Sequence, residues 1–105
     1  MKFGLREEIY IKILEIVAKY NYNFVMFGSR ARGDYRKNSD IDIAVLGDVS
    51  KDDENKIKIE FDAIDMEYIV DLLFVNKITN EELIKNIQKE GAEIKWKGMK
   101  KEEKI

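Results

Sequence analysis

Residues 28–42 read Gly28-Ser29-Arg30-Ala31-Arg32-Gly33-Asp34-Tyr35-Arg36-Lys37-Asn38-Ser39-Asp40-Ile41-Asp42, and the rest of the chain is arranged around them. Short apolar runs flank this stretch, residues 24–27 before it and residues 41–46 at its end. Short apolar runs bounded by glycine or polar residues are typical of buried β-strands. The sequence therefore predicts two strands joined by a polar connection, which begins with a glycine-serine pair and ends with two aspartates.

Gly28 and Ser29 follow directly after the first of these strands. Glycine has no Cβ, so a ligand can approach the backbone closely at Gly28. The hydroxyl and N–H of Ser29 can cap the following turn and face an anion. The pair indicates a phosphate-binding turn, although a glycine and a capping serine after a strand also occur in many α/β proteins that bind no phosphate.

Asp40 and Asp42 open the second strand. Because side chains alternate along a strand, residues two apart point to the same face. Two bare carboxylates side by side repel each other, whereas a divalent cation between them makes the arrangement favourable. Mg²⁺ fits best, since it binds few carboxylates together with phosphate oxygens. The alternative is that both acids are solvated residues on the exposed face of a strand.

Asp71 is the one charged residue in the apolar run 68–75. We interpret this run as a central strand covered on both faces, where a carboxylate is costly unless something compensates it. The run contains no arginine that could do so. Neighbouring strands lie about 4.8 Å apart, so Asp71 can converge on Asp40 and Asp42 if its strand lies beside theirs.

The order and spacing of these residues resemble the motif of the polymerase-β-like nucleotidyltransferases. Ten residues separate Gly28-Ser29 from the Asp40-Ile41-Asp42 element, and the compact form is most similar to the minimal nucleotidyltransferases. In that family the glycine-serine pair holds a triphosphate, the two aspartates bind metal, and a third carboxylate follows on a neighbouring strand. Asp71 matches the third position.

The resemblance implies Mg²⁺-dependent transfer of a nucleoside monophosphate to a hydroxyl, with ATP as the expected substrate. Asp40, Asp42 and Asp71 would be the catalytic residues and would hold two Mg²⁺ ions. Asp71 would complete the metal that activates the acceptor hydroxyl or would accept its proton directly. The chain has no histidine, so a carboxylate or a metal-bound hydroxide is the expected base. Nothing in these residues distinguishes ATP from other triphosphates.

Arg30 and Arg32 are the candidate phosphate donors beside Gly28 and Ser29. The planar guanidinium is well suited to triphosphate oxygens, and the alternative is that both are solvated surface cations. They point to different sides of a turn, so we expect at most one of them to face the phosphates. Gly33 is expected to end this short helical piece with a positive φ.

The composition excludes several kinds of site. The chain has no cysteine and no histidine, which excludes disulfides, thiolate or imidazole metal ligands and cysteine nucleophiles. Its 19 basic and 21 acidic residues give a formal net charge of −2, so no nucleic-acid partner is expected. No apolar stretch approaches the length of a membrane span and the N-terminus lacks a signal-peptide pattern, which predicts a cytoplasmic protein with no membrane partner.

The sequence predicts an α/β fold of the α+β kind, in which helices pack on a small mixed sheet of three to four strands. One nucleotidyltransferase domain is expected over residues 1–97, followed by a charged C-terminal tail over residues 98–105. Helical periodicity and capping boxes at Ser50 and Thr79 predict helices over residues 5–20, 51–65 and 79–91. The last of these should bury Leu83, Ile84 and Ile87. A short strand is expected over residues 93–96.

The acceptor hydroxyl is left open by the residues themselves. The minimal nucleotidyltransferases to which the sequence is similar typically act as antitoxins beside a small all-helical HEPN toxin with RNase activity, and add AMP to a tyrosine of that toxin. The resemblance therefore implies such a partner. Two other functions remain open: an antitoxin that acts by occlusion with a vestigial metal site, and nucleotidyl transfer to a small molecule such as an antibiotic. The intact set of three aspartates argues against occlusion.

Overall fold

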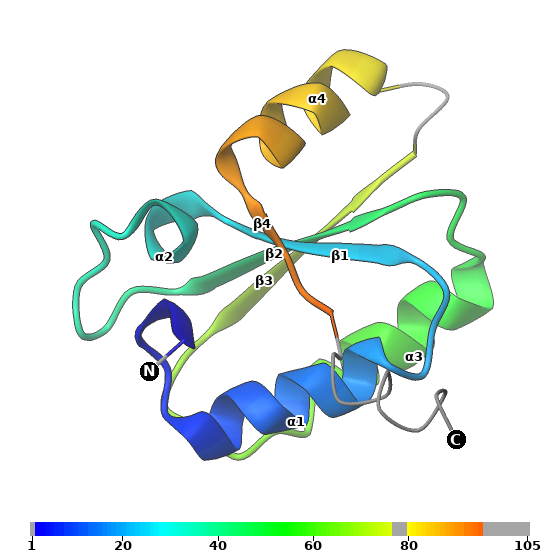
Figure 1. Ribbon diagram of the computed structural model, residues 1–105. Coiled ribbons are helices and arrows are strands. Elements are labelled where there is room, and N and C mark those ends of the chain that lie inside the picture. Colours follow the sequence, from blue (N-terminus) through cyan, green and yellow to red (C-terminus); the bar gives the residue numbers. More distant parts are fainter. Residues whose placement is uncertain (1, 77–79, 96–105) are drawn as a thin grey trace, which may run out of the picture.

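The computed structural model describes residues 2–76 and 80–95, which form helices packed on one sheet (Figure 1). The helical elements are η1 (Lys2–Gly4, a 3-10 helix), α1 (Glu7–Val17), α2 (Gly28–Arg32), α3 (Lys51–Asp62) and α4 (Glu81–Glu90). The strands are β1 (Asn23–Phe27), β2 (Ile41–Leu46), β3 (Val70–Val75) and β4 (Ala92–Glu93). This is the mixed α/β fold that the sequence predicts.

The four strands lie in the order β3-β2-β1-β4. Strand β1 is antiparallel to both β2 and β4, whereas β2 and β3 are parallel. Parallel neighbours need a crossover connection, which α3 provides between the end of β2 and the start of β3. The register of the parallel pair places Asp42 opposite Asp71.

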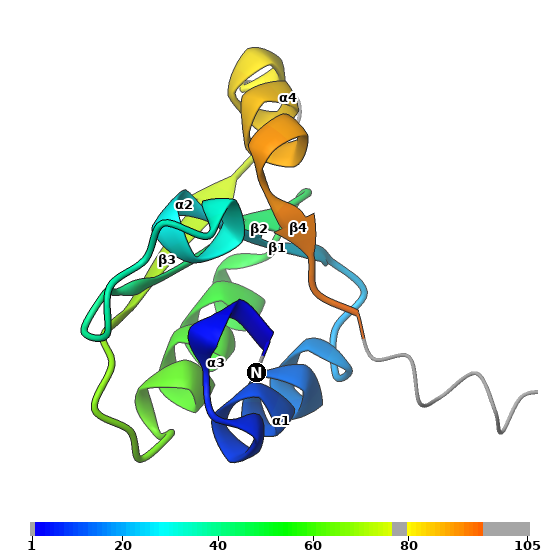
Figure 2. The ribbon, with the colours of Figure 1, turned by 60° about the vertical axis from the view of Figure 1, so that its left-hand side comes forward.

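Helices cover both faces of the sheet (Figure 2). Helices α1 and α3 pack on one face, and alternate residues of the strands join them in the main core, including Phe24, Met26 and Ile43. Helix α4 packs on the other face, where Ile84 and Ile87 contact a smaller set of strand residues. Along β2, Ile41, Ile43 and Val45 belong to the main core. Alternation therefore turns Asp42 toward the α4 face.

Strand β3 differs from its expected form. It lies at an edge of the sheet and is not a central strand, and its residues alternate between partly buried and exposed as far as the buried Val75. Val70, Leu72 and Phe74 pack against the main core, whereas Asp71 and Leu73 are exposed on the α4 face. The expectation of a strand covered on both faces was wrong, because a nearly continuous apolar run also suits an edge strand that is open on one side. Asp71 is therefore not a buried carboxylate.

The predicted helices form, with shorter bounds. Ser50 caps α3 as its capping position predicts, since its Oγ accepts a hydrogen bond from the Asp53 N–H at 3.0 Å. Gly33 ends α2 with φ of +97°, also as predicted. Helix η1 was not predicted. None of the helices in residues 2–76 and 80–95 is long and apolar enough to cross a membrane.

Helix α4 corrects one expectation. Ile84 and Ile87 are buried, but Leu83 is 42% exposed and does not face the core. The helix ends before Gly91, whose φ of −94° is not left-handed. Glycine is needed there for space, since a Cβ would lie 2.5 Å from Cγ1 of Val25. Thr79, Trp96 and the predicted tail over residues 98–105 lie outside the described residues.

Candidate functional site

The glycine-serine turn sits directly against an aspartate. Gly28 begins α2 at the end of β1 and has φ of +73°, a conformation that glycine adopts without strain. A Cβ at this position would overlap Oδ2 of Asp42 and lie 3.1 Å from its Cγ. The β1–β2 register explains this approach, because Phe27 pairs with Asp42. Gly28 therefore leaves the space that the Asp42 carboxylate occupies.

Asp42 and Asp71 lie on adjacent strands at the same level. They are register partners in the parallel β2–β3 pair, so their side chains leave the sheet on the same face. Asp42 is partly buried and Asp71 is exposed. The two acids that the sequence placed on separate strands are thus brought together by the backbone hydrogen bonds of the sheet.

The pKa of the Asp42 carboxyl is raised from its ordinary value. Burial is the largest cause, followed by the negative charges of Asp71 and Asp40 and by a side-chain hydrogen bond with Asp71. The positive charge of Arg32 opposes these effects by a smaller amount. A carboxyl with neighbouring carboxylates is the arrangement in which a cation relieves repulsion.

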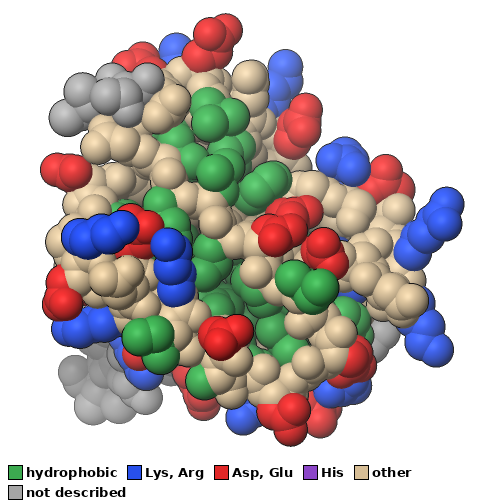
Figure 3. Space-filling view, turned by 180° about the vertical axis from the view of Figure 1, so that it is seen from behind, with side chains coloured by type: hydrophobic (Ala, Val, Ile, Leu, Met, Phe, Trp, Pro, Cys, Tyr) green, Lys and Arg blue, Asp and Glu red, His purple; other side chains and the backbone are tan. Residues whose placement is uncertain are grey.

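Asp40 lies just before β2, and its charge acts on Asp42. In the parts of the chain that the structure describes, no three acidic side chains are yet close enough together to hold a metal ion. The geometry therefore brings Asp42 and Asp71 together and places Asp40 beside them at longer range. Asp40 is exposed, as Asp71 is, whereas Asp42 is partly buried. Figure 3 shows the molecule from behind, with acidic side chains gathered beside a band of hydrophobic ones.

Ser29 and Arg32 border the same turn. Ser29 is the second residue of α2 and is partly buried, and its carbonyl accepts the Gly33 N–H that closes the helix. Arg32 is exposed and forms an ion pair with Asp34, with 3.5 Å between Nε and Oδ2. Because its charge also acts on Asp42, Arg32 is the arginine of this turn that lies within electrostatic reach of the acids.

Arg30 has a place that neither interpretation of its sequence foresaw. Its side chain is 2% exposed, so it is not a solvated cation. Its guanidinium donates to two backbone carbonyls, those of Ser39 and Phe3, and lies over the rings of Tyr35 and Tyr68. The donors that a triphosphate would need are thus engaged within the protein. The motif alone carries no signal for Phe3 and Tyr68, because both are remote in the sequence.

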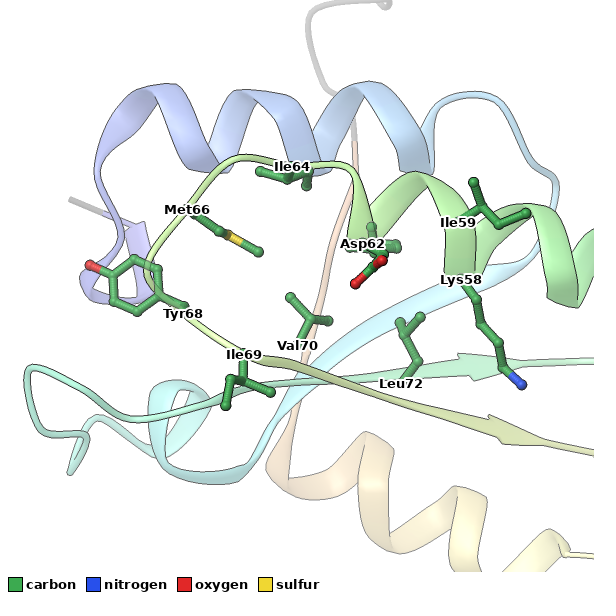
Figure 4. Close-up of a pocket in the computed structure, with 10 residues that line it drawn as sticks. Lys58, Ile59, Asp62, Ile64, Met66, Tyr68, Ile69, Val70 and Leu72 are labelled. Atoms are coloured by element: carbon green, nitrogen blue, oxygen red, sulfur yellow. The ribbon is translucent and has the colours of Figure 1, made fainter.

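A groove lies on the opposite face from the acids. It has a volume of about 610 Å³ and runs between α3 and the start of β3 (Figure 4). Its lining includes Ile64, Met66 and Val70 together with the exposed Ile59 and Ile69. Val70 faces the main core, so this groove does not communicate with Asp42 and Asp71 through the sheet. It is a separate feature from the glycine-aspartate site.

Residues 10–94 match the nucleotidyltransferase domain family. The chain is a member of that family. The match begins within α1 and ends just after β4, so it includes the four strands that the structure describes and every residue of the candidate site in this nucleotidyltransferase.

Two solved structures share the fold of this nucleotidyltransferase. One is a crystal structure of a toxin-antitoxin with AMP-PNP, with 23% identity and a TM-score of 0.61, which covers 83% of this chain and 72% of that chain. The other is a putative nucleotidyltransferase from Sulfolobus solfataricus, with 22% identity and a TM-score of 0.50, which covers 82% of this chain and 76% of that chain. No curated protein matches the sequence significantly.

Proposed function

We propose that this nucleotidyltransferase transfers AMP from ATP, with Mg²⁺, to a tyrosine hydroxyl of a HEPN-type toxin in the cytoplasm and so acts as its antitoxin. The observation that carries the proposal is the pairing of Asp42 with Asp71 directly beside Gly28. The family match supports nucleotidyl transfer. The toxin-antitoxin neighbour with AMP-PNP supports a toxin as partner and an adenine nucleotide as substrate.

Asp40, Asp42 and Asp71 are the residues that would hold Mg²⁺. The donor set fits, because all three are carboxylates. Burial and then the charges of Asp71 and Asp40 raise the pKa of Asp42, and a bound cation would favour its ionised form. When bound, Mg²⁺ supplies Lewis-acid stabilisation of negative charge on the triphosphate and on the leaving pyrophosphate. The exposed Asp40 can turn toward the other two acids without disturbing the sheet.

The turn at Gly28 and Ser29 would bind the triphosphate. The missing Cβ at Gly28 leaves room for the Asp42 carboxylate directly against the turn, and Ser29 offers a hydroxyl and an N–H to phosphate oxygens. Arg32 would add a guanidinium donor, since it is exposed and its charge already reaches Asp42. The ion pair with Asp34 has to open for this, which is a small cost at an exposed site.

Asp71 would receive the proton of the acceptor hydroxyl. It is exposed on the open part of the α4 face, where an incoming hydroxyl can reach it, whereas Asp42 beside it is partly buried. Transfer forms the bond between the acceptor oxygen and the α-phosphorus and breaks the bond to pyrophosphate. The described residues do not cover Asp71 from the solvent side, which supports an acceptor carried by another protein.

The test is AMP transfer in the presence of the product of the neighbouring gene. The protein is incubated with that product, ATP and Mg²⁺, and the intact mass of the product is measured for added AMP units. We expect the mass increase with the wild-type protein and its loss in Asp40→Asn and Asp42→Asn. Asp62→Asn is the matched control, since it removes an exposed carboxylate that lines the groove on the other face.

Two results would contradict the proposal. If Asp40→Asn and Asp42→Asn still neutralise the toxin fully, the protein acts by occlusion. If labelled ATP transfers AMP to hydroxylated small molecules and not to the protein partner, the acceptor is a small molecule.

A further inference from the structure

Arg30 is the only polar or charged residue that is buried in residues 2–76 and 80–95. A buried charge requires compensation, and in this part of the chain no carboxylate forms an ion pair with Arg30. Backbone carbonyls and aromatic faces take that role. The rings of Tyr68 and Tyr35 lie with their centroids 4.7 and 5.2 Å from the guanidinium carbon.

The guanidinium joins two backbone segments that are far apart in the sequence. Nε and Nη2 donate to the carbonyl oxygen of Ser39 at 3.1 and 2.8 Å, and Nη1 donates to that of Phe3 at 3.0 Å. Phe3 has φ of +56°, the only positive φ of a non-glycine residue in the described chain. Such a conformation persists only where the surroundings hold it, and here its carbonyl is held by Arg30.

Ser39 is the residue immediately before Asp40, at the end of the long exposed connection between α2 and β2. Residues 33–38 of that connection are all exposed. Ser39 also anchors a tight turn, because its N–H bonds the Arg36 carbonyl and its Oγ accepts from the Arg36 N–H. Ile41 then enters the sheet by donating to the Ile69 carbonyl. Asp40 therefore lies between two fixed backbone groups. Before it is the Ser39 carbonyl, which accepts from Arg30, and after it is the Ile41 N–H, which donates to the Ile69 carbonyl.

We infer that Arg30 is a positioning residue, which fixes the backbone at Asp40 by clamping the Ser39 carbonyl against the N-terminal segment at Phe3. The inference rests on the proposed function, since it gives Asp40 its place in the metal-binding set. An arginine suits this position because its planar fork reaches both carbonyls at once, which the single ammonium of a lysine cannot do in the same geometry. Arg30 then supports the site without touching the nucleotide.

The experiment compares Arg30→Lys and Arg30→Met with Lys37→Met in the full chain. Lys37→Met removes one positive charge from the exposed part of the same connection and is the matched control. Amide hydrogen exchange is measured by mass spectrometry for residues 34–41 and for α3. AMP transfer is measured as kcat, as KM for ATP and as the Mg²⁺ concentration that gives half the maximal rate.

We expect faster exchange over residues 34–41 in both Arg30 variants and unchanged exchange in α3. A displaced carboxylate should lower kcat about 10-fold in Arg30→Lys and about 100-fold in Arg30→Met, raise the Mg²⁺ requirement, and leave KM for ATP within about 3-fold. Lys37→Met should behave as the wild type in every measurement. If Arg30→Met does not fold, Arg30→Lys alone decides the test.

Three results would overturn the inference. The first is that Arg30→Lys has the exchange and the kcat of the wild type. The second is that it exchanges faster over residues 34–41 while kcat is unchanged. The third is a raised KM for ATP with unchanged kcat, which would make Arg30 a phosphate donor. If the wild-type protein transfers no AMP, the proposed function fails, and Mn²⁺ affinity without nucleotide then decides about Arg30. A lower Mn²⁺ affinity in Arg30→Lys than in Lys37→Met supports the positioning role, and equal affinities overturn it.

Discussion

Asp42 of β2 and Asp71 of β3 are register partners on adjacent parallel strands, and the negative charge of Asp71 contributes to the raised pKa of Asp42. The sheet itself sets this pairing, because a shift of the register by one residue would turn one of the two side chains to the other face. Two acids held in this way cannot move apart without breaking strand hydrogen bonds. The folded state therefore keeps the two carboxylates close enough to repel each other.

The coupling between these acids can be read from the titration of Asp42. In the metal-free wild type, we expect the Asp42 carboxyl to titrate above its ordinary pKa of 3.8. Asp71→Asn removes a neighbouring charge, so the pKa of Asp42 should fall toward that value but stay above it, because burial is the largest cause of the shift. Carboxyl ¹³C chemical shifts followed against pH measure this. An Asp42 pKa that is the same in both proteins would show that the two acids do not interact.

Asp42→Asn should stabilise the metal-free protein at neutral pH. The pKa of Asp42 is higher in the folded state than in the unfolded state, so the ionised carboxylate lowers the free energy of unfolding. This loss is absent below pH 3.8, grows as the pH rises through the raised pKa, and is complete above the raised pKa. Asp42 is partly exposed, so solvent screening limits the gain to about 1 kcal/mol or less. Thermal unfolding of Asp42→Asn and of the wild type is compared in chelator. The variant should have the higher midpoint at pH 7, and the difference should be much smaller at pH 4. A lower midpoint for Asp42→Asn at pH 7 would contradict the clustering of the acids.

Gly28→Ala and Gly33→Ala separate backbone strain from steric overlap. Both glycines have positive φ, but a Cβ at Gly28 would overlap the Asp42 carboxylate, whereas one at Gly33 would meet nothing within 4 Å. We expect each alanine to lower the free energy of unfolding by about 1 kcal/mol through strain. Gly28→Ala should additionally abolish AMP transfer, while Gly33→Ala should keep most of it. Equal activity in the two variants would rule out the close approach of Gly28 to Asp42 as a feature of the site.

Ser50→Ala tests a helix cap away from the site. The Ser50 hydroxyl satisfies the Asp53 N–H at the start of α3, so its loss should lower the free energy of unfolding by about 1 kcal/mol. Urea unfolding measures the change, and Ser50→Asp, which keeps an oxygen at the cap, is the control. The affinity for ATP should not change, because Ser50 lies at the far end of β2 from Asp42. A stability of Ser50→Ala equal to the wild type would show that the cap is not formed in solution.

Local patterns predicted the elements of the fold well. Strand β2 has the bounds of its apolar run, and the cap at Ser50 and the turn at Gly33 follow from short-range hydrogen bonding and from backbone sterics. Such features depend on residues a few positions apart, so they can be read from the sequence directly.

The position of β3 in the sheet could not be read in the same way. Its apolar run suits a central strand and an edge strand equally, and strand order depends on contacts between distant residues. The energetic argument for Asp71 as a buried acid was therefore wrong, although the register still sets Asp71 opposite Asp42. Leu83 was misplaced for a related reason, since helical spacing alone does not say how wide the buried stripe of α4 is.

The role of the Arg30 side chain depends on contacts that lie outside the motif. Its neighbours in the sequence suggest a phosphate donor or a surface cation, whereas its partners are Phe3, Ser39 and Tyr68. Tertiary folding alone brings these residues together. By contrast, Gly28 and Asp42 are separated by a single connection, so their proximity follows once two antiparallel strands are expected.

The dependence of ATP binding on Mg²⁺ tests the central claim most directly. The Kd for ATP is measured by calorimetry with Mg²⁺ and with chelator for the wild type, Asp71→Asn and the control Asp62→Asn. If Asp71 and Asp42 share in holding Mg²⁺, the ion tightens ATP binding about tenfold or more in the wild type and in Asp62→Asn, and this gain is lost in Asp71→Asn. An equal Mg²⁺-dependent gain in all three proteins would contradict the account.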